Sequence, residues 1–205
     1  MYDHGVAPVT AFVLAGGKSI RMGRDKAFLP WRRETLLSHA LKLAGTLTQN
    51  VFIVGEARKF AGLAPVVEDV YQDRGPLGGI HAALSGSSTE WNLMLAVDLP
   101  LVAPRFLQFL ATQAHETGAT VTIPRAGNGW QPLCAVYRRE FAAIAERSLA
   151  GGKNKIDPLF AQVKNHVVEE QELAGLGFSA EMFRNINTPE EWEEAQQAPH
   201  GHRWR

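Results

Sequence analysis

The chain has 205 residues, of which 45% are hydrophobic and 20% charged, and its 21 basic side chains balance 21 acidic ones. This composition predicts one globular domain, residues 1–195, followed by a flexible tail, residues 196–205. The zero net charge excludes a general nucleic-acid binder, and no apolar run approaches the roughly 20 residues that span a membrane. A single cysteine, Cys134, excludes a disulfide framework and a cysteine-rich zinc site. Because the polar start, Met1–Gly5, lacks the pattern of a signal peptide, we expect a cytoplasmic protein.

Short apolar runs alternate along the chain with longer segments of helical period. The predicted strands are Val9–Leu14, Val51–Val54, Val66–Val67, Leu93–Val97, Thr120–Ile123 and Leu133–Tyr137. The predicted helices are Thr35–Leu47, Leu77–Leu84, Arg105–His115 and Glu140–Leu149. This alternation predicts a three-layer, doubly wound α/β fold with a mostly parallel, Rossmann-like sheet. Residues 151–172 are less regular, and a final helix is expected after a capping box formed by Thr188 and Glu191.

Glycines and basic side chains follow the first predicted strand. Gly16 and Gly17 let the backbone turn sharply and approach a ligand closely. Residues 18–26 then carry four basic side chains and one acidic one, a net charge of +3, from Lys18, Arg21, Arg24, Asp25 and Lys26. Such a loop suits a polyphosphate, because arginine and lysine both pair with phosphate oxygens. Its spacing matches neither a P-loop nor the dinucleotide-binding GxGxxG motif.

Carboxylates end two of the other predicted strands. Asp98 follows the fourth strand, where it could hold Mg²⁺ or could form a turn before Pro100. Asp69 follows the third strand and could reach a nucleotide or a metal, or could be a turn residue. The glycine-rich segment Arg74–Gly79 precedes a helix, so it could bind an anion or a nucleobase, or form only a tight turn. In doubly wound sheets, ligands bind beyond the carboxyl ends of the strands, which is where these residues are expected.

Two further segments carry amides. Gln131 begins a strand and could present a polar edge to a second substrate. Asn185 and Asn187 alternate in a short predicted strand, so they are expected to face the same side and could contact a heterocycle. Capping of the following helix by Asn187 or Thr188 explains the same residues equally well.

These segments together resemble the molybdenum cofactor guanylyltransferases, a branch of the nucleotidyltransferase superfamily. The resemblance covers about residues 10–195 and is carried by the following segments: Leu14–Gly17, Arg21–Gly23, Asp25–Lys26, Glu68–Asp69, Gly75–Gly79, Asp98–Pro100, Gln131–Leu133 and Asn185–Glu191. It implies transfer of GMP from GTP to the terminal phosphate of molybdopterin, with release of pyrophosphate. Its implied partners are GTP, molybdopterin, molybdoenzymes and cofactor-delivery proteins, with no nucleic acid and no membrane.

The resemblance also implies roles for individual residues. Lys26, Arg21 and Asp98 would be catalytic, with Asp98 binding Mg²⁺. The nucleotide would be bound by Leu14, Ala15, Gly16, Gly17, Lys26, Asp69, Gly78 and Asp98. Gln131, Asn185 and Asn187 would face the pterin. One position departs from the family, because the second strand ends at Val54–Gly55, where an amide side chain is usual.

Three activities remain compatible with the sequence. A guanylyltransferase is favoured by Gly16, since the cytidylyltransferases of the same cofactor often have alanine there. A cytidylyltransferase or another phosphate-acceptor nucleotidylyltransferase is the first alternative. A nucleotide-binding module without catalysis is the second, and the presence of Lys26, Asp69 and Asp98 together argues against it.

Overall fold

The computed structural model describes residues 8–16, 25–71, 74–127, 129–186 and 191–192. The strands are β1 (Val9–Leu14), β2 (Pro30–Trp31), β3 (Glu34–Thr35), β4 (Val51–Val54), β5 (Val66–Val67), β6 (Trp91–Ala96), β7 (Val121–Ala126), β8 (Gly129–Trp130), β9 (Cys134–Arg138) and β10 (Asn165–Glu169). The helices are α1 (Leu36–Gly45), α2 (Ala57–Phe60), α3 (Gly75–Gly86), α4 (Pro104–Thr117), α5 (Phe141–Ala150), α6 (Asp157–Phe160) and α7 (Glu170–Gly175). Lys26–Phe28 and Ala180–Phe183 form 3₁₀ helices.

The main sheet has the strand order β10–β7–β9–β6–β1–β4–β5. β1 pairs in parallel with β4 and β6, and β4 pairs in parallel with β5, so the carboxyl ends of these four strands meet at one edge. β9 is antiparallel to both β6 and β7, which makes β7 run in the direction of β6. The predicted doubly wound, mostly parallel sheet is therefore confirmed.

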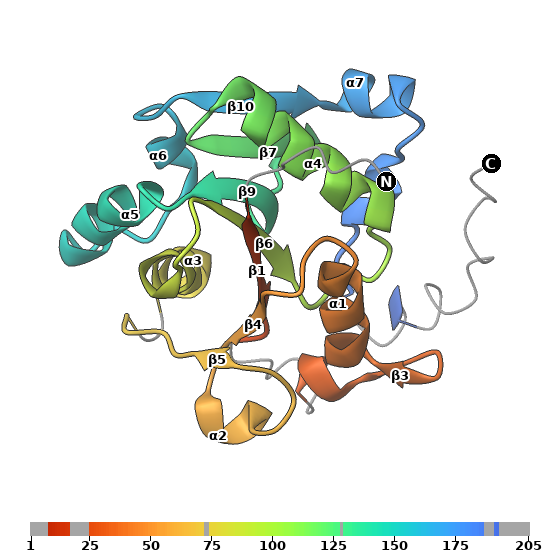
Figure 1. Ribbon diagram of the computed structural model, residues 1–205. Helices are drawn as coiled ribbons and strands as arrows, with labels where there is room; N and C mark the ends of the chain where they lie inside the picture. Colours follow the sequence, from red (N-terminus) through yellow and green to blue (C-terminus); the bar gives the residue numbers. More distant parts are fainter. Residues whose placement is uncertain (1–7, 17–24, 72–73, 128, 187–190, 193–205) are drawn as a thin grey trace.

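Helices cover both faces of this sheet and make the three layers visible in Figure 1, with α3 and α5 on one face and α1 and α4 on the other. Alternate side chains of β1 pack into two hydrophobic clusters, one on each face of the sheet. Ala11 and Val13 belong to the cluster that includes α1 and α4, whereas Phe12 and Leu14 belong to the cluster that includes α3 and α5. A strand buried on both faces needs a continuous apolar run, which explains why the sequence of β1 shows no polar alternation.

Two sequence-based expectations about regular structure were wrong. The irregular segment 151–172 contains a strand, β10, which pairs in parallel with β7. Its sequence gave little signal because only Val168 of the strand is fully buried. The strand expected at residues 183–187 is absent from its described part, since Ala180–Phe183 is a 3₁₀ helix and 184–186 has no regular structure.

Several smaller expectations concern residues that the structure does not describe. Asn187 and most of the predicted capping box, as well as the tail 196–205, lie outside the described residues. Within the described ranges, no helix combines the length and apolar character needed to cross a membrane.

A buried polar network closes the end of the sheet opposite the carboxyl edge. The side chain of Asn92 is fully buried, and its Nδ2 donates to the carbonyls of Thr89 and Glu90 at 3.3 and 3.1 Å. Its Oδ1 accepts from the hydroxyl of Ser87, and Thr89 Oγ1 donates to Thr10 Oγ1 at 2.8 Å. These bonds join the turn before β6 to the start of β1.

Replacing Asn92 with leucine should lower the free energy of unfolding, because the buried partners of its amide lose their hydrogen bonds. Each group left unsatisfied costs about 1–3 kcal/mol. Urea unfolding of Asn92→Leu measures this loss. Ser88→Ala, a change at an exposed position nearby, is the control. Equal stability of the two variants would contradict a stabilising role for the network.

Candidate active site

The backbone after β1 is held between β4 and β6 at the carboxyl edge of the sheet. The amides of Ala15 and Gly16 both donate to the carbonyl of Val54 at 3.1 Å, and the carbonyl of Leu14 accepts from Val97 at 3.1 Å. Leu14 and Ala15 are buried, whereas Gly16 is exposed. The predicted phosphate loop therefore starts from a fixed point. Gly17 and Arg21 lie outside the described residues.

Lys26 and Asp98 meet at this edge although 72 positions separate them in the sequence. Lys26 Nζ lies 3.0 Å from Asp98 Oδ2, and the two side chains are 19% and 20% exposed. Asp98 lies two residues after the end of β6, while Lys26 opens the 3₁₀ helix at the end of the basic loop. Charges that are mostly shielded from water interact more strongly than charges on an open surface. The structure thus brings two of the predicted catalytic residues into direct contact.

Asp69 lies against the first turn of α3. Asp69 Oδ1 accepts from the amide of Tyr71 at 2.8 Å. A Cβ added to Gly78 would lie 2.6 Å from Asp69 Oδ2 and 3.0 Å from the carbonyl oxygen of Tyr71, so only glycine leaves room for this turn. A Cβ on Gly79 would lie 3.1 Å from Leu14 Cδ2, which shows how closely α3 packs on the end of β1.

Burial raises the pKa of the Asp69 carboxyl above its usual value of 3.8. The hydrogen bond from Tyr71 and the charge of His81 act in the opposite direction but do not overcome it. His81 is itself buried, with its ring 5.1 Å from that of Tyr71 and its Nε2 3.2 Å from Ser85 Oγ. The start of α3 and the turn after β5 therefore form one packed unit around Asp69.

The three amides predicted on the pterin side have different surroundings. Gln131 Nε2 donates to the carbonyls of Ala126 and Gly129 at 3.1 and 3.4 Å, so this side chain braces the turn between β7 and β8. Asn185 is exposed, and the amide of its neighbour Ile186 donates to the carbonyl of Asp98 at 3.2 Å. The segment of Asn185 is thus attached beside Asp98 by this bond. Asn187 lies outside the described residues.

Two residues contribute to this edge that were assigned no role from the sequence, although Asp25 belongs to one of the motifs that carry the resemblance. Asp25 accepts from the amide of Ala27 at 3.0 Å and so caps the 3₁₀ helix of Lys26, and Lys59 of α2 forms an ion pair with it. An aspartate two residues before the capped amide is a recognisable N-cap signal. Lys59 had no comparable signal, because α2 is only four residues long.

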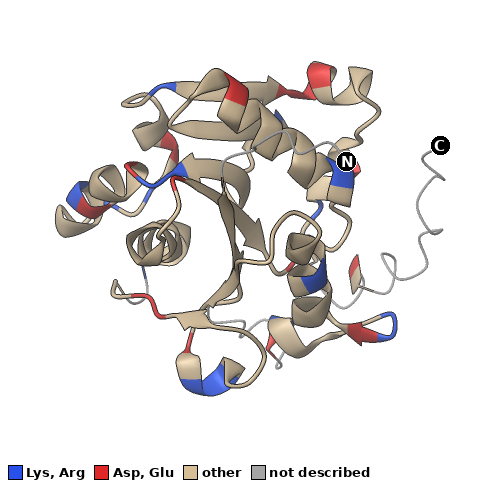
Figure 2. Cartoon of the chain, viewed as in Figure 1, with Lys and Arg blue, Asp and Glu red and all other residues tan. Residues whose placement is uncertain are grey.

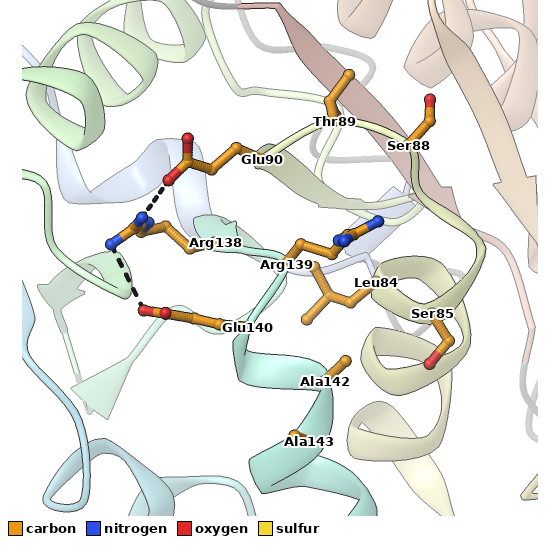
Figure 3. Close-up of a pocket in the computed structure, with 10 residues that line it drawn as sticks. All are labelled: Leu84, Ser85, Ser88, Thr89, Glu90, Arg138, Arg139, Glu140, Ala142 and Ala143. Carbon is orange, nitrogen blue, oxygen red and sulfur yellow. Dashed lines mark hydrogen bonds and ion pairs between the residues drawn. The ribbon is translucent and has the colours of Figure 1, made fainter.

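Charge is distributed around the sheet and not within its centre. Figure 2 shows charged residues on helices and loops, while β1, β4 and β6 carry none. A hollow of about 640 Å³ lies at the amino edge of β6, opposite the predicted site. It is lined by two arginines and two glutamates, and Arg138 is paired there with Glu90 and Glu140, as Figure 3 shows. Its charges balance, and it contains none of the predicted site residues.

Comparison with known proteins decides the family. The sequence profile described as "MobA-like NTP transferase domain" matches residues 11–166. The chain belongs to this family of MobA-like NTP transferase domains. It is therefore a nucleotidyltransferase, as the resemblance of its motifs predicted.

Similar proteins match the chain over most of its length. A probable molybdenum cofactor guanylyltransferase of Pelotomaculum thermopropionicum is 35% identical, over 88% of both chains. The molybdenum cofactor guanylyltransferase of Syntrophotalea carbinolica is 32% identical, over 90% of this chain and 89% of the relative. The crystal structure of molybdopterin-guanine dinucleotide biosynthesis protein A from Archaeoglobus fulgidus superposes with a TM-score of 0.80 at 25% identity, over 91% of this chain and 96% of that one.

The residues at this edge suit a divalent cation that would be bound by a protein carboxylate and a substrate together. Among the residues described, no three histidine, cysteine or acidic side chains form a ready-made metal cluster. Mg²⁺ is commonly bound by one or two carboxylates together with substrate phosphates and water. Asp98, partly exposed at the carboxyl edge, provides one such carboxylate.

The contact between Gly78 and Asp69 makes Gly78→Ala a test of the nucleotide side. The new methyl group must displace the Asp69 carboxylate, and we expect about tenfold weaker nucleotide binding. Gly86→Ala in the same helix is the matched control, since its Cβ would meet only Val67 side-chain atoms, at 3.4 Å or more. Titration calorimetry with GTP compares the two, and equal affinities would contradict a role for Asp69 in binding.

The raised pKa of Asp69 predicts how its effect on stability depends on pH. A carboxyl group whose pKa is raised by folding favours the folded state when protonated and opposes it when charged. Asp69→Asn should therefore be more stable than the wild type at neutral pH, and the gain should shrink as the pH falls through the raised pKa. Asparagine keeps an acceptor for Tyr71. Urea unfolding at several pH values measures the difference, and a variant less stable at pH 7 would contradict the prediction.

Proposed function

We propose that this protein transfers GMP from GTP to the terminal phosphate of molybdopterin. The observation that carries the proposal is the contact between Lys26 and Asp98 beside the backbone that leaves β1. It supplies a cation for phosphate and a carboxylate for a metal ion at one point. The guanylyltransferase names of relatives that match about nine-tenths of the chain support guanine and molybdopterin as the substrates.

The reaction replaces one phosphoanhydride bond with another. An oxygen of the molybdopterin phosphate forms a bond to the α-phosphorus of GTP, and the bond from that phosphorus to the bridging oxygen of the β-phosphate breaks. The electron pair leaves with pyrophosphate. Because the attacking phosphate is already an anion at neutral pH, no side chain has to remove a proton from it. The main barrier is therefore the meeting of two anions.

The chain's own residues address that barrier. Lys26 would exchange its contact with Asp98 for the triphosphate oxygens and stabilise the charge that develops there. Arg21 would add a second cation from the loop. Asp98 would hold Mg²⁺, which neutralises phosphate charge when it is bound. Asp69 and Gly78 would bind the nucleoside, and the backbone of Leu14–Gly17 would bind the phosphates.

The other half of the proposed site would receive the acceptor. Asn185, beside Asp98, and Gln131, in the turn before β9, would contact the pterin together with Asn187. Molybdoenzymes and cofactor-delivery proteins as partners, and the cytoplasm as the location, stay predictions from the sequence.

A nucleotide panel tests the proposal. Binding of GTP, CTP, ATP and UTP, each with and without Mg²⁺, should show a preference for GTP that depends on the metal ion. Asp98→Asn should weaken the effect of Mg²⁺ and reduce turnover by about 100-fold, the cost of losing one group that stabilises the transition state. Release of pyrophosphate in the presence of molybdopterin measures turnover.

The panel separates the possible outcomes. A preference for CTP would indicate that the protein transfers CMP from CTP and not GMP from GTP. Binding of GTP with no release of pyrophosphate would indicate a binding module without catalysis. Unchanged Mg²⁺ dependence in Asp98→Asn would contradict the metal role of that residue.

A further inference from the structure

Asp25 makes two different contacts just before the proposed phosphate-binding lysine. Its Oδ1 accepts from the amide of Ala27 at 3.0 Å, which fixes the first turn of the 3₁₀ helix that Lys26 opens. Its Oδ2 pairs with the ammonium group of Lys59. One carboxylate therefore connects the backbone at Lys26 to α2, the helix that follows β4.

The helix that carries Lys59 is fixed by aromatic packing. Phe60 is fully buried, and its ring stacks on that of Phe28, with 5.9 Å between the ring centres. A Cβ on Gly55 would lie 2.6 Å from Phe60 Cε2, so this ring occupies the space that a side chain at the end of β4 would need. Both ends of the Lys26–Phe28 turn are thus attached to α2, by Lys59 at Asp25 and by Phe60 at Phe28.

Lys59 lies in an unusual place for a lysine. Its side chain is only 23% exposed, and its ammonium group lies 4.8 Å from the centre of the Phe60 ring. Burial lowers the pKa of Lys59, which reflects the cost of shielding its charge from water. The neighbouring carboxylate and aromatic ring offset that cost. Arg58, the preceding residue of α2, is exposed. A basic side chain on this helix can therefore lie in solvent, whereas that of Lys59 does not.

We propose that Lys59 is a positioning residue, which acts through Asp25 to hold the turn that directs Lys26 towards Asp98 and the triphosphate. The inference rests on the phosphate-binding role proposed for Lys26, but not on the identity of the base. Lys59 does not itself contact the substrate in this proposal. It limits the positions that Lys26 Nζ can reach, and a displacement of about 1 Å at a reacting group can cost about 100-fold in rate.

The first test replaces Lys59 with methionine, which keeps most of the aliphatic length and removes the charge. We expect kcat/KM to fall about 10-fold to 100-fold. Arg58→Met, on the same short helix, is the matched control and should keep the wild-type value. Lys59→Arg should recover most of the activity, because it restores the ion pair with Asp25. Wild-type activity in Lys59→Met would overturn the proposal.

A double-mutant cycle separates positioning from direct contact with phosphate. If Lys59 acts only through Lys26, then Lys59→Met should cause no further loss in a Lys26→Ala background. An equal loss in both backgrounds would overturn the proposal and assign Lys59 a direct role. If Lys26→Ala is itself fully active, the failure lies in the proposed function and in this inference together. If Lys26→Ala is impaired while Lys59→Met is not, only this inference fails.

A second variant keeps the test decisive if Lys59→Met folds poorly. Asp25→Asn retains an acceptor for the amide of Ala27 but loses the charge that pairs with Lys59. It should show a similar loss in kcat/KM, and adding Lys59→Met should make it no worse, because the pair is already broken. Thermal unfolding of each variant identifies losses that come from the fold alone. A further loss in the double variant, with stability unchanged, would contradict the proposed connection.

Discussion

The position of β1 between β4 and β6 is the constraint on which the site depends. Backbone hydrogen bonds from both neighbours continue past the end of β1, to the amides of Ala15 and Gly16 on one side and to the carbonyl of Leu14 on the other. The strand also contributes alternate side chains to two separate cores. Its carboxyl end is therefore fixed on all sides. Asp98, which follows β6, and Asp69, which follows β5, are placed relative to that end by the parallel register of the sheet.

Charge at this edge is organised by short elements that lie outside the sheet. Lys26 and Asp98 form one ion pair, and Lys59 and Asp25 form another. In both pairs the side chains are mostly shielded from water, which makes their geometry matter more than it would on an open surface. A protein with no net charge can still concentrate positive charge locally, since residues 18–26 carry a net charge of +3.

The sequence predicted the central strands well because each is a continuous apolar run. Val9–Leu14 and Val51–Val54 have the bounds that were expected. Asp98 was recognised because a charged residue at the end of a buried strand has no packing reason to be there. Lys26 was recognised because it ends a run of basic residues that resembles the loop of the family. β10 was missed because an edge strand with one fully buried residue lacks that apolar signal. Lys59 was missed because it meets Asp25 across 34 positions of the sequence, a contact that no local pattern reveals.

The reversal of β9 has a consequence for how such a site can diversify. Because β9 runs against β6, its amino end reaches the carboxyl edge, where the amide of Ala96 donates to the carbonyl of Leu133 at 2.7 Å. The turn that carries Gln131 therefore stands next to the end of β6 without belonging to β1, β4 or β5. Insertions or substitutions in that turn can alter one side of the proposed site while the strands on the other side keep their register. Under the proposed function, selection for a new acceptor and selection for a given donor would then act on separate segments of the chain.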